Sequence, residues 1–94
     1  MTTRLEHNAA DTRFEIYVDD VLAGYADYAE RTEPKVRDFH HTMTFPEFRG
    51  QGIAAKVVEF ALADSRAQGF SVIPTCWYVD KFIAEHSEYG DLVG

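Results

Sequence analysis

The feature that most constrains the fold is a change of hydrophobic period at the stretch FPEFRGQGIAAK, residues 45–56. Before it, residues 35–45 alternate between two faces, as a β-strand does. After it, residues 51–68 show the helical spacing of an amphipathic helix, and Gly69 stands where a left-handed C-terminal cap is expected. The helix is predicted to bury Ile53, Val57, Phe60 and Ala61, and to turn Lys56, Glu59, Asp64 and Arg66 toward water. A strand, a glycine loop and a helix therefore follow one another directly.

The flanking segments supply the other strands. Residues 13–18 alternate and lead through the turn signal Asp19-Asp20 to a return strand over 21–29, which predicts a hairpin. RTEP (31–34) is expected to break the pattern before residue 35. The remaining elements are expected to be a short strand near 4–8, a strand at 70–74, and a helix at 78–89 with Val79, Phe82 and Ile83 as its apolar face.

Connectivity then predicts the architecture. A strand that follows a strand–helix pair is expected to lie parallel to the first strand of that unit. The predicted fold is an α/β sheet in the order β-β-β-β-α-β-α, with an antiparallel beginning and a parallel last pair.

Alternation also assigns faces within residues 35–45. Phe39, His41, Met43 and Phe45 share one face, and Asp38, His40, Thr42 and Thr44 share the other. On this interpretation His41 is a hydrogen-bonded core histidine and His40 faces solvent or the sheet surface. A β-bulge would exchange the faces beyond it.

Composition limits the class of protein. The 94 residues are 46% hydrophobic, which suits one folded domain over residues 1–94. A net charge of −7 disfavours sequence-independent binding to nucleic acid or to an anionic membrane surface. The one cysteine, Cys76, excludes an intrachain disulfide and fits a reducing compartment. With no apolar signal region at the start, the expected location is cytoplasmic.

The glycine loop admits two interpretations. Gly50 and Gly52 permit close approach of a ligand, Arg49 adds a cation, and the following helix start leaves amides unpaired, which together suit a diphosphate. The alternative is a turn that binds nothing. The loop is neither a Walker loop, because no G-K-[ST] occurs, nor the dinucleotide fingerprint, because the third glycine is missing.

Three linked motifs resemble one family. Residues 49–54, RGQGIA, match the [Q/R]-x-x-G-x-[G/A] signature of the GNAT superfamily of acetyl-CoA-dependent N-acetyltransferases. The pair His41-Thr42 before the loop, and PTCWYV at 74–79 after the next strand, are similar to the small single-domain members. The resemblance runs over roughly residues 13–89. It departs from the usual form in HTMTFP, where the proline comes one position later, and in EHSEY near the end.

The resemblance implies how acetyl-CoA is held as co-substrate. In this superfamily the fourth strand and the next one diverge, and the pantetheine arm pairs with the fourth strand. This assigns the pantetheine contact to the backbone of Thr42, Met43 and Thr44. The phosphates are assigned to the amides of Arg49, Gly50, Gln51, Gly52, Ile53 and Ala54. Independently, Pro74 cannot donate a ladder hydrogen bond, so its strand must be at an edge or parting from its neighbour there.

Acetyl transfer also needs groups that move protons and stabilise an oxyanion. A strand amide near Met43 is a candidate for the oxyanion. Cys76 is interpreted either as general acid or nucleophile, or as a small buried hydrophobe. Tyr78 is a second candidate acid or a structural aromatic. His41 is a candidate base by its ordinary pKa.

A metal site built from His40, His41, Cys76 and His86 lacks ligand spacing, so no metal is expected. Trp77 and the tyrosines are expected in the core or the cleft wall.

The predicted function is acetyl-CoA-dependent N-acetyltransfer to an unidentified amine on a protein, peptide or small molecule. The alternatives are a non-enzymatic acyl-CoA-binding or sensing module and an adaptor that only retains the fold. Short connections leave the acceptor side open, so a protein or peptide acceptor is expected, or a partner subunit that completes the pocket. The expected state is a monomer or weak homodimer.

Overall fold

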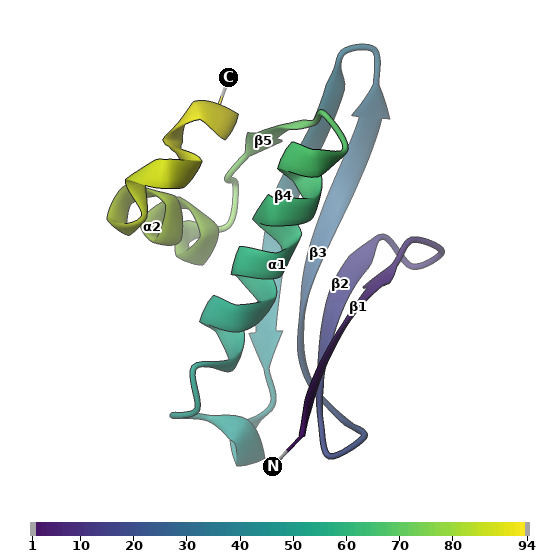
Figure 1. Cartoon of the computed structure of the whole chain (residues 1–94), viewed down its shortest axis with the longest axis vertical. Coiled ribbons are helices and arrows are strands. Elements are labelled where there is room, and N and C mark those ends of the chain that lie inside the picture. Colours follow the sequence, from purple (N-terminus) through teal and green to yellow (C-terminus); the bar gives the residue numbers. More distant parts are fainter. Residues whose placement is uncertain (1, 94) are drawn as a thin grey trace.

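A computed structural model describes residues 2–93 as one five-stranded sheet with two helices (Figure 1). Along the chain the elements are β1 Thr3–Asn8, β2 Arg13–Val18, β3 Val21–Thr32, β4 Lys35–Thr44, the 3₁₀ helix η1 Pro46–Phe48, α1 Ile53–Ala67, β5 Ser71–Ile73, α2 Trp77–Glu85 and the 3₁₀ helix η2 Ser87–Leu92.

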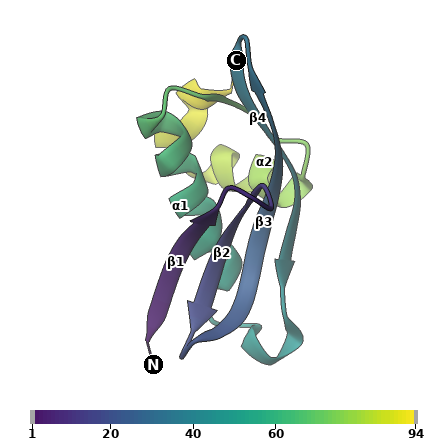
Figure 2. The same ribbon diagram turned by 90° about the vertical axis from the view of Figure 1, so that its right-hand side faces the viewer.

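The spatial order of the strands is β1-β2-β3-β4-β5. The first four strands pair antiparallel. The strands β4 and β5 pair parallel, and α1 is the crossover connection between them. The predicted fold class is confirmed. Both helices lie on one side of the sheet, as Figures 1 and 2 show.

The core lies between α1 and the covered face of the sheet. Residues 13–18 alternate as predicted, with Phe14, Ile16 and Val18 buried. The α1 residues Ile53, Val57, Ala61 and Leu62 pack against them, and α2 adds Val79, Phe82 and Ile83. At the end of α1, Gly69 has φ +80° and Phe70 N–H donates to Ser65 O at 2.8 Å, which confirms the predicted left-handed cap.

Several element boundaries differ from the prediction. β3 continues to Thr32, so the expected break at 31–34 is only the turn of a longer β3–β4 hairpin. Residues 31–34 were predicted to end the strand pattern because turn residues interrupt the alternation. Pairing between β3 and β4 nevertheless extends both of these strands up to the turn. α2 begins at Trp77 and ends at Glu85, after which residues 87–92 form η2 rather than more α-helix.

A register shift in β4 reverses part of the predicted face assignment. Tyr28 pairs with Phe39 but Asp27 pairs with His41, so His40 is an extra, bulged residue. Beyond it, Thr42 lies opposite buried Ala26 on the helix-covered face. The prediction that His41, Met43 and Phe45 share a face with Phe39 is therefore wrong.

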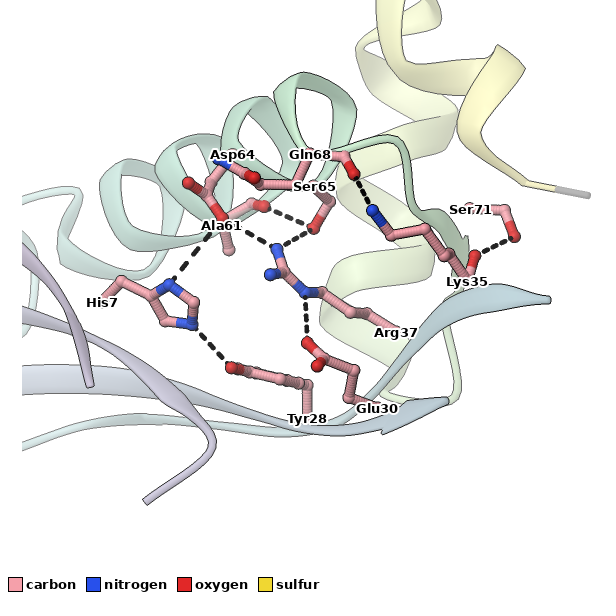
Figure 3. A network of polar contacts seen from close by, with 10 residues as sticks. All are labelled: His7, Tyr28, Glu30, Lys35, Arg37, Ala61, Asp64, Ser65, Gln68 and Ser71. Carbon is pink, nitrogen blue, oxygen red and sulfur yellow. Dashed lines mark hydrogen bonds and ion pairs between the residues drawn. The ribbon is translucent and has the colours of Figure 1, made fainter. Parts of the chain in front are cut away.

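A buried arginine organises the polar side of the interface between α1 and the sheet (Figure 3). Arg37 is only 3% exposed, and its guanidinium donates to Asp64 at 2.8 Å and to Glu30 at 3.1 Å. A buried charge needs such partners. Asp64 is consequently half-buried, which corrects its predicted place on the water-facing side of α1.

His7 connects β1 to the same network. Its Nε2 lies 2.6 Å from the Tyr28 hydroxyl, its ring stacks on Phe14 at a centroid distance of 4.1 Å, and Nδ1 lies 3.8 Å from an Asp64 oxygen. Burial lowers the pKa of His7, and the nearby Arg37 lowers it further, against weaker opposing effects of Asp64 and Glu30.

Candidate functional site

The strands β4 and β5 part just before the segment that leads into α2. Their pairing covers Val36↔Ser71 to Asp38↔Ile73, and β4 continues six residues further to Thr44. Within the described part of the chain, residues 40–44 have no strand partner on the β5 side. Pro74 directly follows the last pair, which confirms the prediction that its strand parts from its neighbour there. We call residues 40–44 on this side the open edge of β4.

Main-chain groups along the open edge alternate in direction. Phe45 N–H donates to Ala23 O on β3 at 2.9 Å, so alternation turns the main-chain groups of Met43 toward β3 as well. The Met43 carbonyl oxygen does lie against β3, 2.5 Å from where a Cβ on Gly24 would stand. The N–H and C=O groups of Thr42 and Thr44 consequently face the open edge.

The glycine loop follows the open edge at the start of α1. Gly50 has φ +82° and Gly52 has φ +71°, conformations that glycine adopts without steric cost. A Cβ at either position would meet no atom within 4 Å, so the space next to the loop is free.

The start of α1 offers unpaired donors to that free space. The first helical hydrogen bond is Lys56 N–H to Gly52 O, which leaves the preceding amides without acceptors inside the helix. Gly52 provides no side-chain cap for them. Arg49 is exposed at the other end of the loop. These groups can hold an anion.

Cys76 lies beside Thr42 where α2 begins. Its Sγ is 3.6 Å from Thr42 Oγ1, its N–H donates to Phe39 O at 2.8 Å, and it is the N-cap residue of α2. The thiol is half-buried and packs against the core. The bulge at His40 brings this pair together, since regular alternation would have turned Thr42 to the opposite face.

Tyr78 lies in the first turn of α2 and is half-buried against the core. Burial raises the pKa of its hydroxyl, and the negative charge of Glu85 raises it further. The side chain is therefore a neutral O–H donor at physiological pH.

His41 is separated from Cys76 by the sheet. It is exposed on the face without helices, where its ring lies 6.1 Å from the ring of Tyr25. The prediction of a core histidine is wrong, because the bulge turns this residue outward. His40 is exposed, as predicted. Trp77 is 72% exposed, which corrects its predicted place in the core or cleft wall.

A cavity of about 310 Å³ lies away from the open edge, near the opposite end of β4, where Arg37, His7 and Tyr28 contribute to its lining. Among residues 2–93, no three His, Cys, Asp or Glu side chains are grouped as a metal site. Over the same residues, no helix has the length and apolar character needed to span a membrane.

Three residues at the site were missed by sequence reasoning. Gly24 is buried on β3 where Met43 and Ile53 approach it closely. Asp38 accepts a hydrogen bond from Thr75 Oγ1 at 2.5 Å. A glycine within a strand pattern is the one available signal for such close approach, whereas a contact between positions 37 apart leaves no local pattern.

Comparison with known proteins identifies the family to which this arrangement belongs. The model of the GCN5-related N-acetyl-transferase family matches residues 13–92. Among curated proteins, Protein NATD1 of Bos taurus is 26% identical over 83 residues, which cover 88% of this chain and 74% of that protein. Protein NATD1 of Homo sapiens is 25% identical over 83 residues, with the same coverage.

Solved structures share the fold at lower identity. Ribosomal-protein-alanine N-acetyltransferase from Brucella melitensis biovar Abortus 2308 has a TM-score of 0.58 and 20% identity, over 65% of this chain and 47% of that one. Aminoglycoside N-acetyltransferase AAC(6')-Iy in complex with CoA has a TM-score of 0.56 and 20% identity, over 83% and 57%. Glucosamine-6-phosphate N-acetyltransferase from Arabidopsis thaliana has a TM-score of 0.52 and 19% identity, over 70% and 51%.

The chain thus spans about half the length of these solved proteins, from 47% to 57%. The family match covers most of the chain and includes the glycine loop, the open edge and the start of α2. It confirms the family and the class of function that the three motifs predicted: this chain belongs to the GCN5-related N-acetyltransferase family.

Proposed function

We propose that this chain transfers an acetyl group from acetyl-CoA to an amine, with the open edge of β4 and the glycine loop as the binding surface for the co-substrate. The observation that carries the proposal is the parting of β4 from β5, which leaves residues 40–44 without a strand partner on the β5 side, between the glycine loop and Cys76. We also propose that residues 1–94 act as one domain.

The residues present fit coenzyme A. The outward main-chain groups of Thr42 and Thr44 suit the amides of pantetheine, which need partners along an extended strand edge. The Arg49 amide, which was predicted to contact the phosphates, donates to Pro46 O at 3.3 Å. We therefore propose that the amides of residues 50–54 and the Arg49 guanidinium hold the diphosphate. Met43 was predicted to contact pantetheine through its backbone, but its main-chain groups face β3, so we assign the backbone contact to Thr42 and Thr44 alone.

Acetyl-CoA supplies an activated thioester, and the protein must orient it, stabilise the developing oxyanion and return a proton to sulfur. The outward amide of Thr42 or Thr44 replaces the strand amide near Met43 as the proposed oxyanion donor. Tyr78 lies in the first turn of α2 and stays protonated at neutral pH, so we propose it as a candidate general acid for the leaving thiolate.

Three roles stay open for Cys76: general acid, nucleophile, or a small hydrophobe in the wall of the site. The distance of 3.6 Å between its Sγ and Thr42 Oγ1 on the open edge supports a position at the site and is compatible with each role. His41 lies on the other face of the sheet, so as a base it would have to act on an amine that approaches from the face without helices.

The acceptor is proposed only as an amine. The relatives of known structure are named for a ribosomal protein, an aminoglycoside and an amino sugar, which share an amine and little else. The net charge of −7 favours a cationic acceptor. A cytoplasmic location and a monomeric or weakly dimeric state stay predictions.

The proposal is tested by titration of the ¹⁵N-labelled chain with acetyl-CoA, followed by release of free CoA in the presence of peptide and small-molecule amines. We expect saturable binding that shifts the amides of residues 42–54, and turnover with at least one amine. Binding with no turnover across the panel would favour the alternative, a non-enzymatic acyl-CoA-binding module. Absence of saturable binding would refute both.

The roles of two side chains are tested in the same assay. If Tyr78 is the acid, Tyr78→Phe lowers kcat by about 10²-fold and leaves acetyl-CoA affinity unchanged. If Cys76 is structural, Cys76→Ala lowers stability and leaves kcat within about 2-fold, whereas a nucleophilic cysteine would leave no turnover in this variant.

A further inference from the structure

Asp38 and Thr75 are joined at the point where β4 and β5 separate. Asp38 is the last β4 residue paired with β5, opposite Ile73. Two residues after Ile73, Thr75 Oγ1 donates to Asp38 Oδ1 at 2.5 Å. The next residue, Cys76, donates its N–H to Phe39 O. Two further hydrogen bonds thus link the two segments beyond the end of the strand ladder.

The chemistry of Pro74 explains why the next hydrogen bond to β4 comes from a side-chain hydroxyl. Pro74 lies between the ladder and Thr75 and has no N–H to donate. The cross-strand link is therefore continued by the Thr75 side chain and then by the Cys76 amide. We call these two hydrogen bonds, Thr75–Asp38 and Cys76–Phe39, the clamp.

The clamp fixes the start of α2. Cys76 is the N-cap residue of that helix, and its thiol lies 3.6 Å from Thr42 Oγ1 on the open edge. Tyr78 follows in the first helical turn. The distance from both side chains to the open edge is consequently set by where the clamp holds the chain.

The energetics favour a role in positioning over a role in stability. Thr75 is exposed, so its hydrogen bond to Asp38 replaces one to water and contributes only modestly to the stability of the fold. A displacement of about 1 Å in a catalytic group can nevertheless change a rate by about 10²-fold.

We propose that Asp38 and Thr75 are positioning residues, which hold Cys76 and the start of α2 against the open edge of β4. The consequence for catalysis rests on the proposed acetyltransferase function. The consequence for the geometry of Cys76 does not, and it is measurable without acetyl-CoA.

The chain offers a matched set of variants. Thr75→Val removes the hydroxyl at nearly constant shape, and Thr75→Ser restores it. Ser71→Ala is the control, because Ser71 Oγ donates to Lys35 O at 3.3 Å across the same strand pair, at the end remote from Cys76.

The first measurement uses the protein alone. Cys76 is the one cysteine in the chain, so the rate of reaction with an aromatic disulfide reports on this thiol alone. We expect Thr75→Val to raise both that rate and the hydrogen exchange of the Cys76 amide by about 5- to 10-fold, the amount that follows from weakening the clamp by about 1 kcal/mol. In Thr75→Ser and Ser71→Ala both rates should remain within about 2-fold of wild type, because residue 75 keeps a hydroxyl group in each variant.

The second measurement is turnover at saturating acetyl-CoA. We expect Thr75→Val and Asp38→Ala each to lower kcat by about 10-fold with little change in the KM for acetyl-CoA, because the glycine loop is untouched. The double variant should be no slower than the slower single variant, since both remove one contact.

The outcomes separate the two proposals. Wild-type thiol reactivity and amide exchange in Thr75→Val would overturn the clamp, and so would a failure of Thr75→Ser to restore them. If the wild-type chain shows no turnover but Thr75→Val shows the expected rise in both rates, the clamp stands and the proposed acetyltransferase function fails.

Discussion

Gly24 on β3 lies directly against Ile53, the first residue of α1. A Cβ on Gly24 would stand 2.9 Å from Ile53 Cγ2 and 2.5 Å from the Met43 carbonyl oxygen. The absence of a side chain at this one position lets the glycine loop, the start of α1 and the open edge of β4 come together. The proposed coenzyme surface therefore depends partly on a residue outside all three motifs.

Gly24→Ala is expected to destabilise the fold by about 1–3 kcal/mol, because the backbone oxygen of Met43 cannot move away as a flexible side chain would. It should also weaken acetyl-CoA binding. Urea unfolding and calorimetric titration measure the two effects. Gly90→Ala is the control, since a Cβ there meets no atom within 4 Å, and it should change neither quantity. Full retention of acetyl-CoA affinity in Gly24→Ala would contradict the role of Gly24 in bringing the glycine loop and the open edge together.

Gly52→Ala is expected to weaken acetyl-CoA binding through backbone strain. The left-handed conformation at φ +71° costs an L-residue about 1–2 kcal/mol, so the loop will relax and its amides will move.

Gly69→Ala is the matched control for Gly52→Ala, because it places the same strain at φ +80° at the opposite end of α1. Both variants should lose similar thermal stability, and only Gly52→Ala should lose affinity for acetyl-CoA. Equal affinity loss in the two would show that strain in α1, and not the loop, controls binding.

The pH dependence of turnover is expected to report on Tyr78. Burial and Glu85 raise the pKa of its hydroxyl, so the proton-donating form persists up to and above the ordinary tyrosine pKa of about 10. Its contribution to kcat should be complete at neutral pH and lost as pH rises through the raised value. Wild type should therefore show an alkaline decline that is missing from the residual activity of Tyr78→Phe. The same decline in both proteins would assign it to another group.

Acid is expected to weaken the attachment of β1 through His7. The pKa of His7 in the fold is lowered by burial and by Arg37, so between that value and the ordinary value of 6.5 the unfolded chain binds a proton that the folded chain does not. Stability is then complete above 6.5 and falls as pH drops below it.

Urea unfolding at a series of pH values below 6.5 measures this effect. His7→Gln keeps a partner for the Tyr28 hydroxyl and cannot titrate, so its stability should fall less steeply with acid than that of wild type. Parallel slopes for the two proteins would exclude His7 as the source.

Local sequence patterns predicted most of the architecture, because strand alternation, helical spacing and helix caps are determined by residues close together in the sequence. The period of residues 13–18, the helical spacing after Gly52 and the cap at Gly69 each depend on neighbours within a few positions. Pro74 was informative for the same reason, since a missing N–H limits pairing wherever it stands.

The errors arose where distant segments decide the outcome. The bulge at His40 depends on how β4 aligns with β3, and no residue type in 35–45 specifies it. The burial of Arg37 depends on Glu30 and Asp64, which come from two other elements, so no local pattern indicates it. The clamp between Asp38 and Thr75 was invisible for the same reason. The family resemblance compensated for part of this, because it carried the relation between the loop and the fourth strand.

The open edge of β4 also has a consequence for how the chain behaves in a concentrated solution. Unpaired strand groups are a template on which the strand of another molecule can add, and short, covered edges are the usual protection. If the open edge binds the coenzyme as proposed, it must stay accessible, so its protection has to come from the ligand that occupies it. Acetyl-CoA seated along residues 40–44 would therefore keep molecules of this chain apart as well as serve the reaction. The coenzyme-free protein is expected to be the form more prone to self-association.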